Sequence, residues 1–266
     1  MPASDFETDL TLLTDAARAA GEIALGYWRK GPDAWDKGDG AGPVSEADLA
    51  VNAMLEAELR GARPDYGWLS EESTDDPARL EAGRVFIVDP IDGTRAFLAE
   101  DGSFAHALSV VENGEVVAGV VHLPVVGLTY AATRDGAALL NGAPIQPNSR
   151  AEIDGSTVLT SKLSDDPGHW RQGQRPDYRR SLRPSLAWRL CLVAEGRFDA
   201  TISLRPAWEW DTAAASLISE RAGAICTDQR GERLRFNNAI PQSRGLVVAN
   251  PALHAAFLSQ LRDWPI

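Results

Sequence analysis

The spacing of apolar residues predicts a chain in which helices and strands are mixed. Five segments repeat apolar positions with the period of an amphipathic helix. A capping box at Ser4-x-x-Glu7 marks the start of the first segment, Gly223 follows the fourth, and Asn250-Pro251 opens the last. The predicted helices cover residues 4–27 or 4–30, 49–60, 185–195, 207–222, and 251 onward.

Between these helices, short apolar runs bounded by turn residues predict strands. Asn113-Gly114 separates two such runs and is a strong hairpin signal. Residues 31–43 are rich in Gly and Asp and predict a mobile loop, and residues 165–180 predict a loop with surface elements. In the first half we expect two helices followed by a largely antiparallel sheet. The predicted strands cover residues 66–70, 85–88, 104–111, 115–123, 128–132, 157–161, 198–204, 224–227, 234–236 and 246–249.

The strand predicted at residues 85–88 leads into two closely spaced acidic residues. Pro90 has no N–H to donate to a strand ladder, so we expect this strand to stop at Asp89-Pro90. Asp89 and Asp92 supply two carboxylates, and the Ile91 carbonyl lies between them in the sequence. Hard oxygen ligands of this kind are typical of a Mg²⁺ site.

Gly93 and Thr94 follow and open a predicted helix, whose first N–H groups form an anion site. The combination predicts a Mg²⁺-phosphate site, and the alternative is a plain strand–turn–helix joint with Asp92 as an N-cap. Asp-Gly-Thr also resembles the haloacid-dehalogenase phosphatases, whose nucleophilic aspartate lies two residues earlier. Here Asp89 lies three residues before Asp92, which favours attack by metal-activated water over a phospho-aspartate.

Charge and cysteine content exclude several classes of protein. The 266 residues carry a net charge of −12, which argues against a sequence-independent nucleic-acid binder and against an anionic membrane surface as partner. The longest apolar region, residues 116–132, is interrupted by His122 and Pro124 and predicts paired strands, with no transmembrane segment. Cys191 and Cys226 lie far apart, which predicts a reduced, cytoplasmic protein.

Four short motifs lie along the chain: Pro43-Val-Ser-Glu-Ala-Asp48, Ser70-Glu-Glu-Ser73, Asp89-Pro-Ile-Asp-Gly-Thr94 and Trp210-Asp-Thr-Ala-Ala214. They resemble the signature motifs of the inositol monophosphatase superfamily, in that family's order. The resemblance implies an α/β fold, a layered αβαβα sandwich with a larger antiparallel sheet and a smaller mixed sheet. It also implies one phosphatase domain with two lobes, approximately residues 1–145 with most metal ligands and 146–266 with Asp211 and the substrate pocket.

The resemblance also implies the ligands of two metal ions. Glu71, Asp89 and the Ile91 carbonyl correspond to one site, and Asp89, Asp92 and Asp211 correspond to a second. A third, weaker Mg²⁺ near Glu71 is usual in such enzymes, so we expect two to three ions. Unpaired carboxylates gathered at one point would repel one another and raise their own pKa values, and divalent cations remove that penalty.

The same resemblance implies catalytic roles. Asp48 and Thr94, with Glu71, match the positions that hold and deprotonate the attacking water, with Thr94 as relay. The Gly93 and Thr94 amides match the phosphate cradle. Asp48 also fits a simpler role as an early-turn acid favoured by the helix dipole.

Three branches of the superfamily compete for the substrate. Arg95-Ala96-Phe97 resembles both bisphosphate nucleotidases and histidinol-phosphate phosphatases, whereas residues 209–214, Glu-Trp-Asp-Thr-Ala-Ala, favour the nucleotidases. We therefore expect hydrolysis of 3′-phosphoadenosine 5′-phosphate to AMP and phosphate. The alternatives are inositol 1-phosphate, then histidinol phosphate. The segment 183–186, Arg-Pro-Ser-Leu, departs from the small-residue loop usual in nucleotidases, and Ser185 is its candidate substrate contact.

Other residues leave two interpretations open. Glu209 matches a position that hydrogen-bonds a sugar hydroxyl, or it is a helix-entry acid; Lys37 matches a lysine near the third metal, or it is a solvated loop residue. Trp208 and Trp210 are expected to be packing residues at the helix entry and not a platform on which a base stacks. By resemblance we expect a lithium-sensitive homodimer. A catalytically silent relative that binds another macromolecule is the alternative from a different class, and the complete set of ligand residues argues against it.

Overall fold

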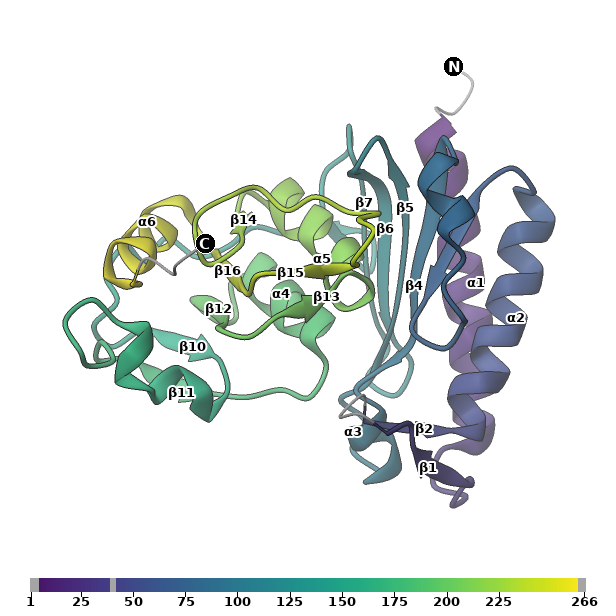
Figure 1. Cartoon of the computed structure of the whole chain (residues 1–266), viewed down its shortest axis with the longest axis horizontal. Coiled ribbons are helices and arrows are strands. Elements are labelled where there is room, and N and C mark those ends of the chain that lie inside the picture. The colour runs from purple at the N-terminus through teal and green to yellow at the C-terminus, as the bar shows by residue number, and fades with distance from the viewer. Residues whose placement is uncertain (1–4, 39–41, 263–266) are drawn as a thin grey trace.

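The computed structural model describes residues 5–38 and 42–262, and its largest element is a seven-stranded sheet (Figure 1). The strands follow one another across the sheet in chain order, and only β3 and β4 run parallel. Asn113 and Gly114 both adopt positive φ, which gives the tight turn of the predicted hairpin between β5 and β6. The strands are β3 (Gly67–Ser70), β4 (Arg84–Asp92), β5 (Ala105–Glu112), β6 (Glu115–Leu123), β7 (Leu128–Thr133), β8 (Leu139–Leu140) and β9 (Ala143–Pro144).

A second, five-stranded sheet contains both parallel and antiparallel pairs. Its order is β11-β10-β12-β16-β14, in which β10 runs parallel to both of its neighbours and β16 runs antiparallel to both of its own. The predicted smaller mixed sheet is thus confirmed. Its strands are β10 (Thr157–Leu159), β11 (Arg179–Ser181), β12 (Ala200–Ser203), β14 (Ile225–Thr227) and β16 (Leu246–Ala249).

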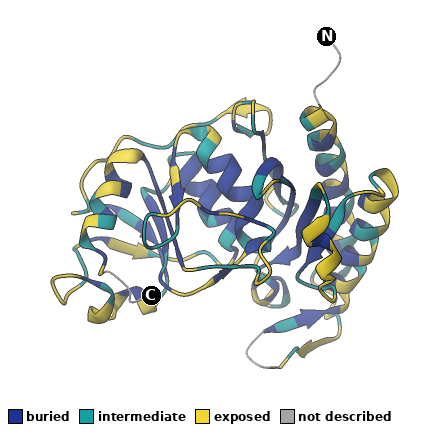
Figure 2. Ribbon diagram, turned by 45° about the horizontal axis from the view of Figure 1, so that its top comes forward, coloured by how far each residue is buried: buried dark blue, intermediate teal, exposed yellow. Residues whose placement is uncertain are grey.

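Helices fill the layers around and between the two sheets, which confirms the predicted αβαβα sandwich. In Figure 1, α1 (Asp5–Tyr27) and α2 (Glu46–Ala62) cover the outer face of the larger sheet. Figure 2 shows the buried central pair, α4 (Leu186–Ala194) and α5 (Glu209–Ala222). α6 (Pro251–Gln260) packs on β16. The shorter elements are β1 (Ala34–Asp36), β2 (Pro43–Ser45), α3 (Thr94–Leu98), β13 (Ala207–Trp208), β15 (Gln242–Ser243), and 3₁₀ turns at Pro77–Glu81, Lys162–Asp165 and Pro167–His169.

Both faces of the larger sheet are buried, as the alternate residues of β4 show. Val85 and Ile87 pack against the central helices, whereas Phe86 and Val88 pack against α1 and α2. A strand that is buried on both faces reads as a continuous apolar run, which is why residues 85–88 show no alternation in the sequence.

Helix α5 lies unusually close to the larger sheet, at Gly119 of β6. A Cβ at this position would lie 2.9 Å from the carbonyl oxygen and 3.0 Å from the Cα of Ala214, so only glycine fits without moving the helix. Ala213, Ala214 and Ala215 keep the contacting turn equally small. This close approach fixes where the first turn of α5 reaches the end of the sheet.

Five predictions about individual elements are wrong. The helix predicted over 207–222 begins at Glu209, because Ala207 and Trp208 form β13, which pairs antiparallel with β15. β4 does not stop at Asp89-Pro90 but runs to Asp92, because a register shift between Asp89 and Asp92 leaves Pro90 outside the ladder, where its missing N–H breaks no bond. Residues 234–236 form no strand, although Leu234 and Phe236 are buried as alternate residues of a strand would be.

The other two errors concern the segment that precedes α2. Part of the predicted loop 31–43 is β1, which pairs antiparallel with β2. Helix α2 begins at Glu46, three residues earlier than predicted, with Ser45 as its N-cap. Ser4 of the predicted capping box and residues 39–41 of the loop lie outside the described residues. Within the described ranges, no helix is both long and apolar enough to cross a membrane.

Candidate active site

The parallel pairing of β3 and β4 brings two acidic residues together. Ser70 lies opposite Val88 in the register, and the Glu71 amide donates a 3.3 Å hydrogen bond to the Val88 carbonyl. Because the carboxyl ends of parallel strands meet at one edge, the residues that follow, Glu71 and Asp89, lie side by side there.

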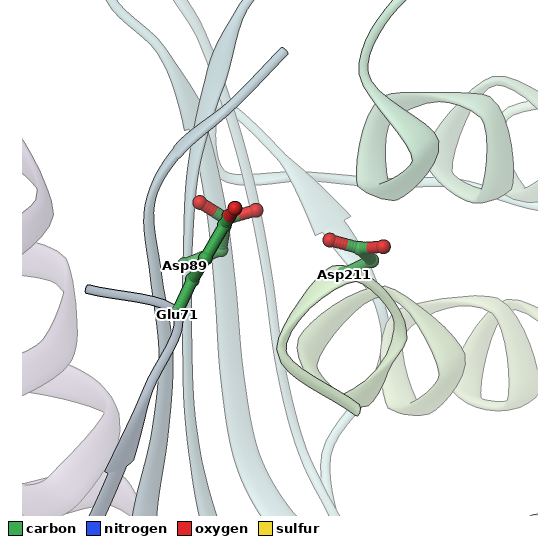
Figure 3. A group of neighbouring side chains, drawn as sticks. All are labelled: Glu71, Asp89 and Asp211. Carbon is green, nitrogen blue, oxygen red and sulfur yellow. The ribbon is translucent and has the colours of Figure 1, made fainter. Parts of the chain in front are cut away.

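Asp211 joins this pair from the first turn of α5. Figure 3 shows the carboxylates of Glu71 and Asp89, at the ends of neighbouring strands, facing that of Asp211 at the start of the helix. One carboxylate oxygen from each of the three residues lies within 4.8 Å of the other two. Segments that are more than a hundred residues apart in the chain thus meet in one acidic group.

Asp89 has a buried carboxylate that lacks hydrogen-bond donors, so its surroundings favour a bound cation more clearly than those of the other acidic residues. It is 1% exposed, and neither carboxylate oxygen has a hydrogen-bond partner within the described part of the chain. Burial, followed by the charge of Glu71, raises the pKa of Asp89 well above its usual value. Burial and the charge of Asp92 do the same for Asp211. Buried oxygens without donors, all of them hard ligands, fit a divalent cation such as Mg²⁺.

Asp92 lies outside this group of three and binds the start of α4. Its carboxylate accepts hydrogen bonds from the Ser185 hydroxyl at 2.6 Å, the Ala187 amide at 2.7 Å and the Leu186 amide at 3.1 Å. Burial raises the pKa of Asp92 to about 6, and these three donors oppose that rise. The alternative interpretation of Asp92 as the N-cap of the helix that follows it is wrong, because Gly93 is the N-cap of α3. The Asp92 carboxylate instead binds the first amides of α4, which begins 94 residues later.

Thr94 and Asp48 form a buried pair behind the end of β4. The Thr94 hydroxyl lies 3.0 Å from Asp48 Oδ1 and 3.2 Å from the Ile91 carbonyl oxygen. Asp48 is held by a capping box, in which its Oδ2 accepts hydrogen bonds from both the amide and the hydroxyl of Ser45. Burial raises the pKa of Asp48. Asp48 is thus an early-turn acid and, at the same time, the partner of Thr94.

Gly93, which starts α3, adopts a backbone conformation that suits glycine. Its φ is +100°, in the left-handed region. A Cβ here would also lie 3.4 Å from the Ser185 amide nitrogen. The turn between Asp92 and Thr94 therefore depends on the absence of a side chain.

Lys37 contacts the acidic group, and it reveals a residue that the sequence interpretation missed. Its ammonium lies 2.6 Å from Glu71 Oε1 and 2.9 Å from Glu72 Oε1. The side chain of Glu72 is only 4% exposed. Burial, then repulsion by Glu71, raises the pKa of Glu72 to about 7. The placement favours the interpretation of Lys37 as a residue of the site over that of a solvated loop lysine.

Comparison with known proteins settles the family. Residues 5–264 match the inositol monophosphatase family. The chain belongs to this family. It is therefore a metal-dependent phosphatase, and the predicted class of hydrolase is confirmed.

Relatives in this family differ in the activity that their names give. The chain is 32% identical over 255 residues to a histidinol-phosphatase of Chlorobaculum parvum, covering 92% of this chain and 93% of that protein. It is 34% identical over 200 residues to the 3′(2′),5′-bisphosphate nucleotidase CysQ of Salmonella typhimurium, covering 73% and 79%. A solved structure, that of the IMPase of Thermotoga maritima, superposes with a TM-score of 0.80 at 27% identity over 95% of each chain.

The two predicted substrate contacts, Glu209 and Ser185, are buried and form hydrogen bonds within the protein. Glu209 is 2% exposed, and its carboxylate accepts hydrogen bonds from the Asn237 amide and from the amide and side chain of Asn238. Arg79, also buried, binds the same loop through the Asn237 side chain and the Asn238 carbonyl. This placement favours the structural role of Glu209 at the start of α5. Ser185 is fully buried between Asp92 and the first turn of α4.

Proposed function

We propose that this family member hydrolyses 3′-phosphoadenosine 5′-phosphate to AMP and phosphate, using two or three Mg²⁺ ions. The observation that supports the chemistry best is the buried Asp89 carboxylate, which has no donor among the described residues and faces Glu71 and Asp211. A carboxylate in this position is destabilising unless a cation compensates it.

In the proposed site, Glu71, Asp89 and the Ile91 carbonyl hold one ion, and Asp89, Asp92 and Asp211 hold another. When bound, the ions activate a water molecule, neutralise the phosphate and stabilise the leaving oxygen. Asp92 has a second task in this arrangement, because the same carboxylate accepts three hydrogen bonds from α4 and the residue that precedes it.

The proposed proton path runs through Thr94. Its hydroxyl donates to Asp48 Oδ1 at 3.0 Å, which leaves the oxygen free to accept a proton from the attacking water. As the water oxygen bonds to phosphorus, the bond from phosphorus to the ester oxygen breaks. One water proton passes to Thr94 and the Thr94 proton passes to Asp48, while the leaving alkoxide takes up a proton from solvent. The raised pKa of Asp48 brings this carboxylate closer to the range in which it can receive a proton near neutral pH. We propose that the amides of Gly93 and Thr94 hold the phosphate oxygens.

The choice of substrate depends on charge around the acidic group. Arg189, on α4, is fixed by hydrogen bonds from its guanidinium to the Arg183 and Pro184 carbonyls. It lies within the electrostatic range of Asp92 and Asp211. A permanent cation beside the metal site suits a substrate with a second phosphate and disfavours the ammonium group of histidinol phosphate.

Histidinol phosphate, ranked after inositol 1-phosphate from the sequence, becomes the second candidate, because a relative that matches 92% of the chain is a histidinol-phosphatase. Comparing kcat/KM for the bisphosphate nucleotide, inositol 1-phosphate and histidinol phosphate with Mg²⁺ tests the proposal. We expect the bisphosphate to be preferred. A clear preference for either of the other esters would overturn the choice of substrate and leave the class of enzyme intact.

The homodimer and the lithium sensitivity are proposals that come from the family alone. Light scattering at several protein concentrations tests the first, and inhibition by LiCl at fixed Mg²⁺ tests the second. The alternative is that the protein is a catalytically silent relative that binds another macromolecule. Calorimetry that detects metal binding, together with no phosphate release from a broad panel of esters, would support this alternative.

A further inference from the structure

The segment that leads into α5 carries an exposed aromatic residue close to the acidic group. Trp208 is the last residue of β13 and the N-cap of α5 (Figure 1), and it is 39% exposed. Its ring stacks on that of Trp210, with the ring centroids 4.6 Å apart and the planes 9° from parallel. The sequence had suggested that both tryptophans are packing residues, and the structure assigns this role to Trp210 alone.

The stack makes the Trp208 ring a rigid surface. Trp210 packs against the buried layer between the two sheets and supports one face of Trp208. The N-cap and third residues of a helix have neighbouring side chains, as in a capping box, so Trp208 and Asp211 leave α5 on the same side. A preorganised, partly exposed aromatic ring is therefore held next to a residue of the acidic group.

A cation lies three residues before Trp208. Arg205 is exposed, and among the described residues no acidic side chain forms an ion pair with it. Burial, and also the charge of Arg205, lowers the pKa of Arg189, whose guanidinium is held in place by two carbonyls. Because these two arginines repel each other, an anion that contacts both would stabilise them.

We propose that Trp208 stacks on the purine ring of the leaving group and that Arg205, together with Arg189, binds its second phosphate. This inference rests on the proposed nucleotidase activity and names the residues that would select the substrate. The segment 205–211 would then supply three elements of recognition: a cation, an aromatic surface and the ligand Asp211. Inositol offers neither a planar ring nor a second phosphate, and histidinol offers a ring with an ammonium group, which the arginines repel.

The test separates stacking from general damage to the enzyme. It compares Trp208→Leu, Trp208→Phe and Arg205→Gln with the matched control Arg18→Gln, which changes an exposed arginine on α1. For each variant, kcat and KM are measured with 3′-phosphoadenosine 5′-phosphate and with glycerol 2-phosphate, which has neither ring nor second phosphate. The readout is the ratio of the two kcat/KM values, and the inhibition constant of AMP against glycerol 2-phosphate is measured alongside.

We expect Trp208→Leu to lower the ratio roughly tenfold, mainly through KM, since stacking on an aromatic side chain contributes that much per base. Trp208→Phe should restore most of the ratio. Arg205→Gln should raise KM for the bisphosphate severalfold and weaken its dependence on salt, and Arg18→Gln should change nothing. A ratio that is the same in wild type, Trp208→Leu and Trp208→Phe overturns the inference.

Inhibition by AMP shows whether the inference about Trp208 is wrong or only the proposed substrate is wrong. If the wild type prefers another ester but AMP still inhibits it, and inhibits Trp208→Leu roughly tenfold less, the stacking surface is supported although the substrate assignment is wrong. If AMP inhibits both proteins no better than ribose 5-phosphate, Trp208 binds no purine and the inference is overturned.

Discussion

The hydroxyl of Ser185 donates a 2.6 Å hydrogen bond to Asp92 Oδ2, and this bond joins the end of β4 to the start of α4. Ser185 is also the N-cap of α4, where its oxygen accepts a hydrogen bond from the Trp188 amide. In the proposed site, Asp92 is a metal ligand as well. One carboxylate therefore serves a metal and a helix terminus.

Ser185→Ala separates these two roles, whereas a change of Asp92 would remove both at once. We expect a loss of about 1 kcal/mol in the free energy of unfolding, typical for an N-cap, and a higher Mg²⁺ concentration for half-maximal activity. Thermal unfolding and a Mg²⁺ titration of kcat measure the two effects. The matched control is Ser161→Ala, which removes the cap of a 3₁₀ turn in the connection between β10 and β11 and should leave the Mg²⁺ requirement unchanged.

Asp89→Asn should make the metal-free protein more stable and the enzyme inactive. The amide removes a buried charge and can donate to the oxygens of Glu71 and Asp211, so we expect a gain of roughly 1–3 kcal/mol in EDTA. Wild type should gain about 2.7 kcal/mol from Mg²⁺ at a hundred times its Kd, and the variant should lose most of that gain. Thermal unfolding with EDTA and with Mg²⁺ measures both. A variant less stable than wild type in EDTA would show that Asp89 is satisfied without metal.

Thr94→Val should lower kcat by roughly 10²–10⁴, the usual range for loss of proton transfer. The substitution keeps the volume of the side chain but removes the hydroxyl that contacts Asp48. Thr94→Ser keeps the hydroxyl and is the control that should retain most of the activity. Equal activity of the valine and serine variants would exclude the proposed relay.

Stability of the metal-free protein should fall as pH rises from about 4 to 7. Burial raises the pKa of Asp92 from 3.8 to about 6 and that of Glu72 from 4.5 to about 7. A carboxyl group whose folded pKa exceeds its unfolded value binds more protons when folded. Its contribution is complete below the unfolded pKa and is lost as pH passes the folded pKa.

Bound Mg²⁺ should reverse this trend, because the ion competes with those protons and binds more tightly as pH rises. Melting temperatures across this pH range, with EDTA and with Mg²⁺, measure both effects. Metal-free stability that rises steadily with pH would show that these carboxyl groups do not have raised pKa values in the folded protein.

Gly119→Ala should destabilise the protein by roughly 1–3 kcal/mol and lower kcat, because the added methyl group pushes α5 and Asp211 away from the sheet. The control is Gly26→Ala, in α1, where a Cβ meets nothing within 4 Å. That change should stabilise the protein by roughly 0.4–1 kcal/mol. Chemical denaturation and steady-state kinetics compare the two. If Gly119→Ala behaved like the control, the close approach would not be what positions Asp211.

Local signals were sufficient for much of this fold. The hairpin at Asn113-Gly114 and the N-cap at Asn250 follow from short-range rules, and the structure has both. The motifs also located Glu71, Asp89 and Asp211, which the structure places together. Their roles as metal ligands remain predictions.

The errors have a common cause, which is that a partner distant in sequence decides the outcome. Glu72 is buried because Lys37 arrives from a hairpin 35 residues earlier. The Asp92 carboxylate binds the first amides of α4, which begins 94 residues later. Leu234 and Phe236 alternate like strand residues, but the Phe236 amide binds the Gly114 carbonyl at the tip of a hairpin instead of a neighbouring strand.

The loop at Asn237 and Asn238 is bound from two sides, by Glu209 at the start of α5 and by Arg79 in the connection between β3 and β4. Glu209, Arg79 and this loop are not proposed as metal ligands, but their hydrogen bonds connect the helix that contains Asp211 to the segment that follows Glu71. Engineers who transplant this loop from a relative to change selectivity should expect the transplant to alter metal affinity too. A chimaera that keeps metal affinity will have to exchange Arg79, Glu209 and the loop together.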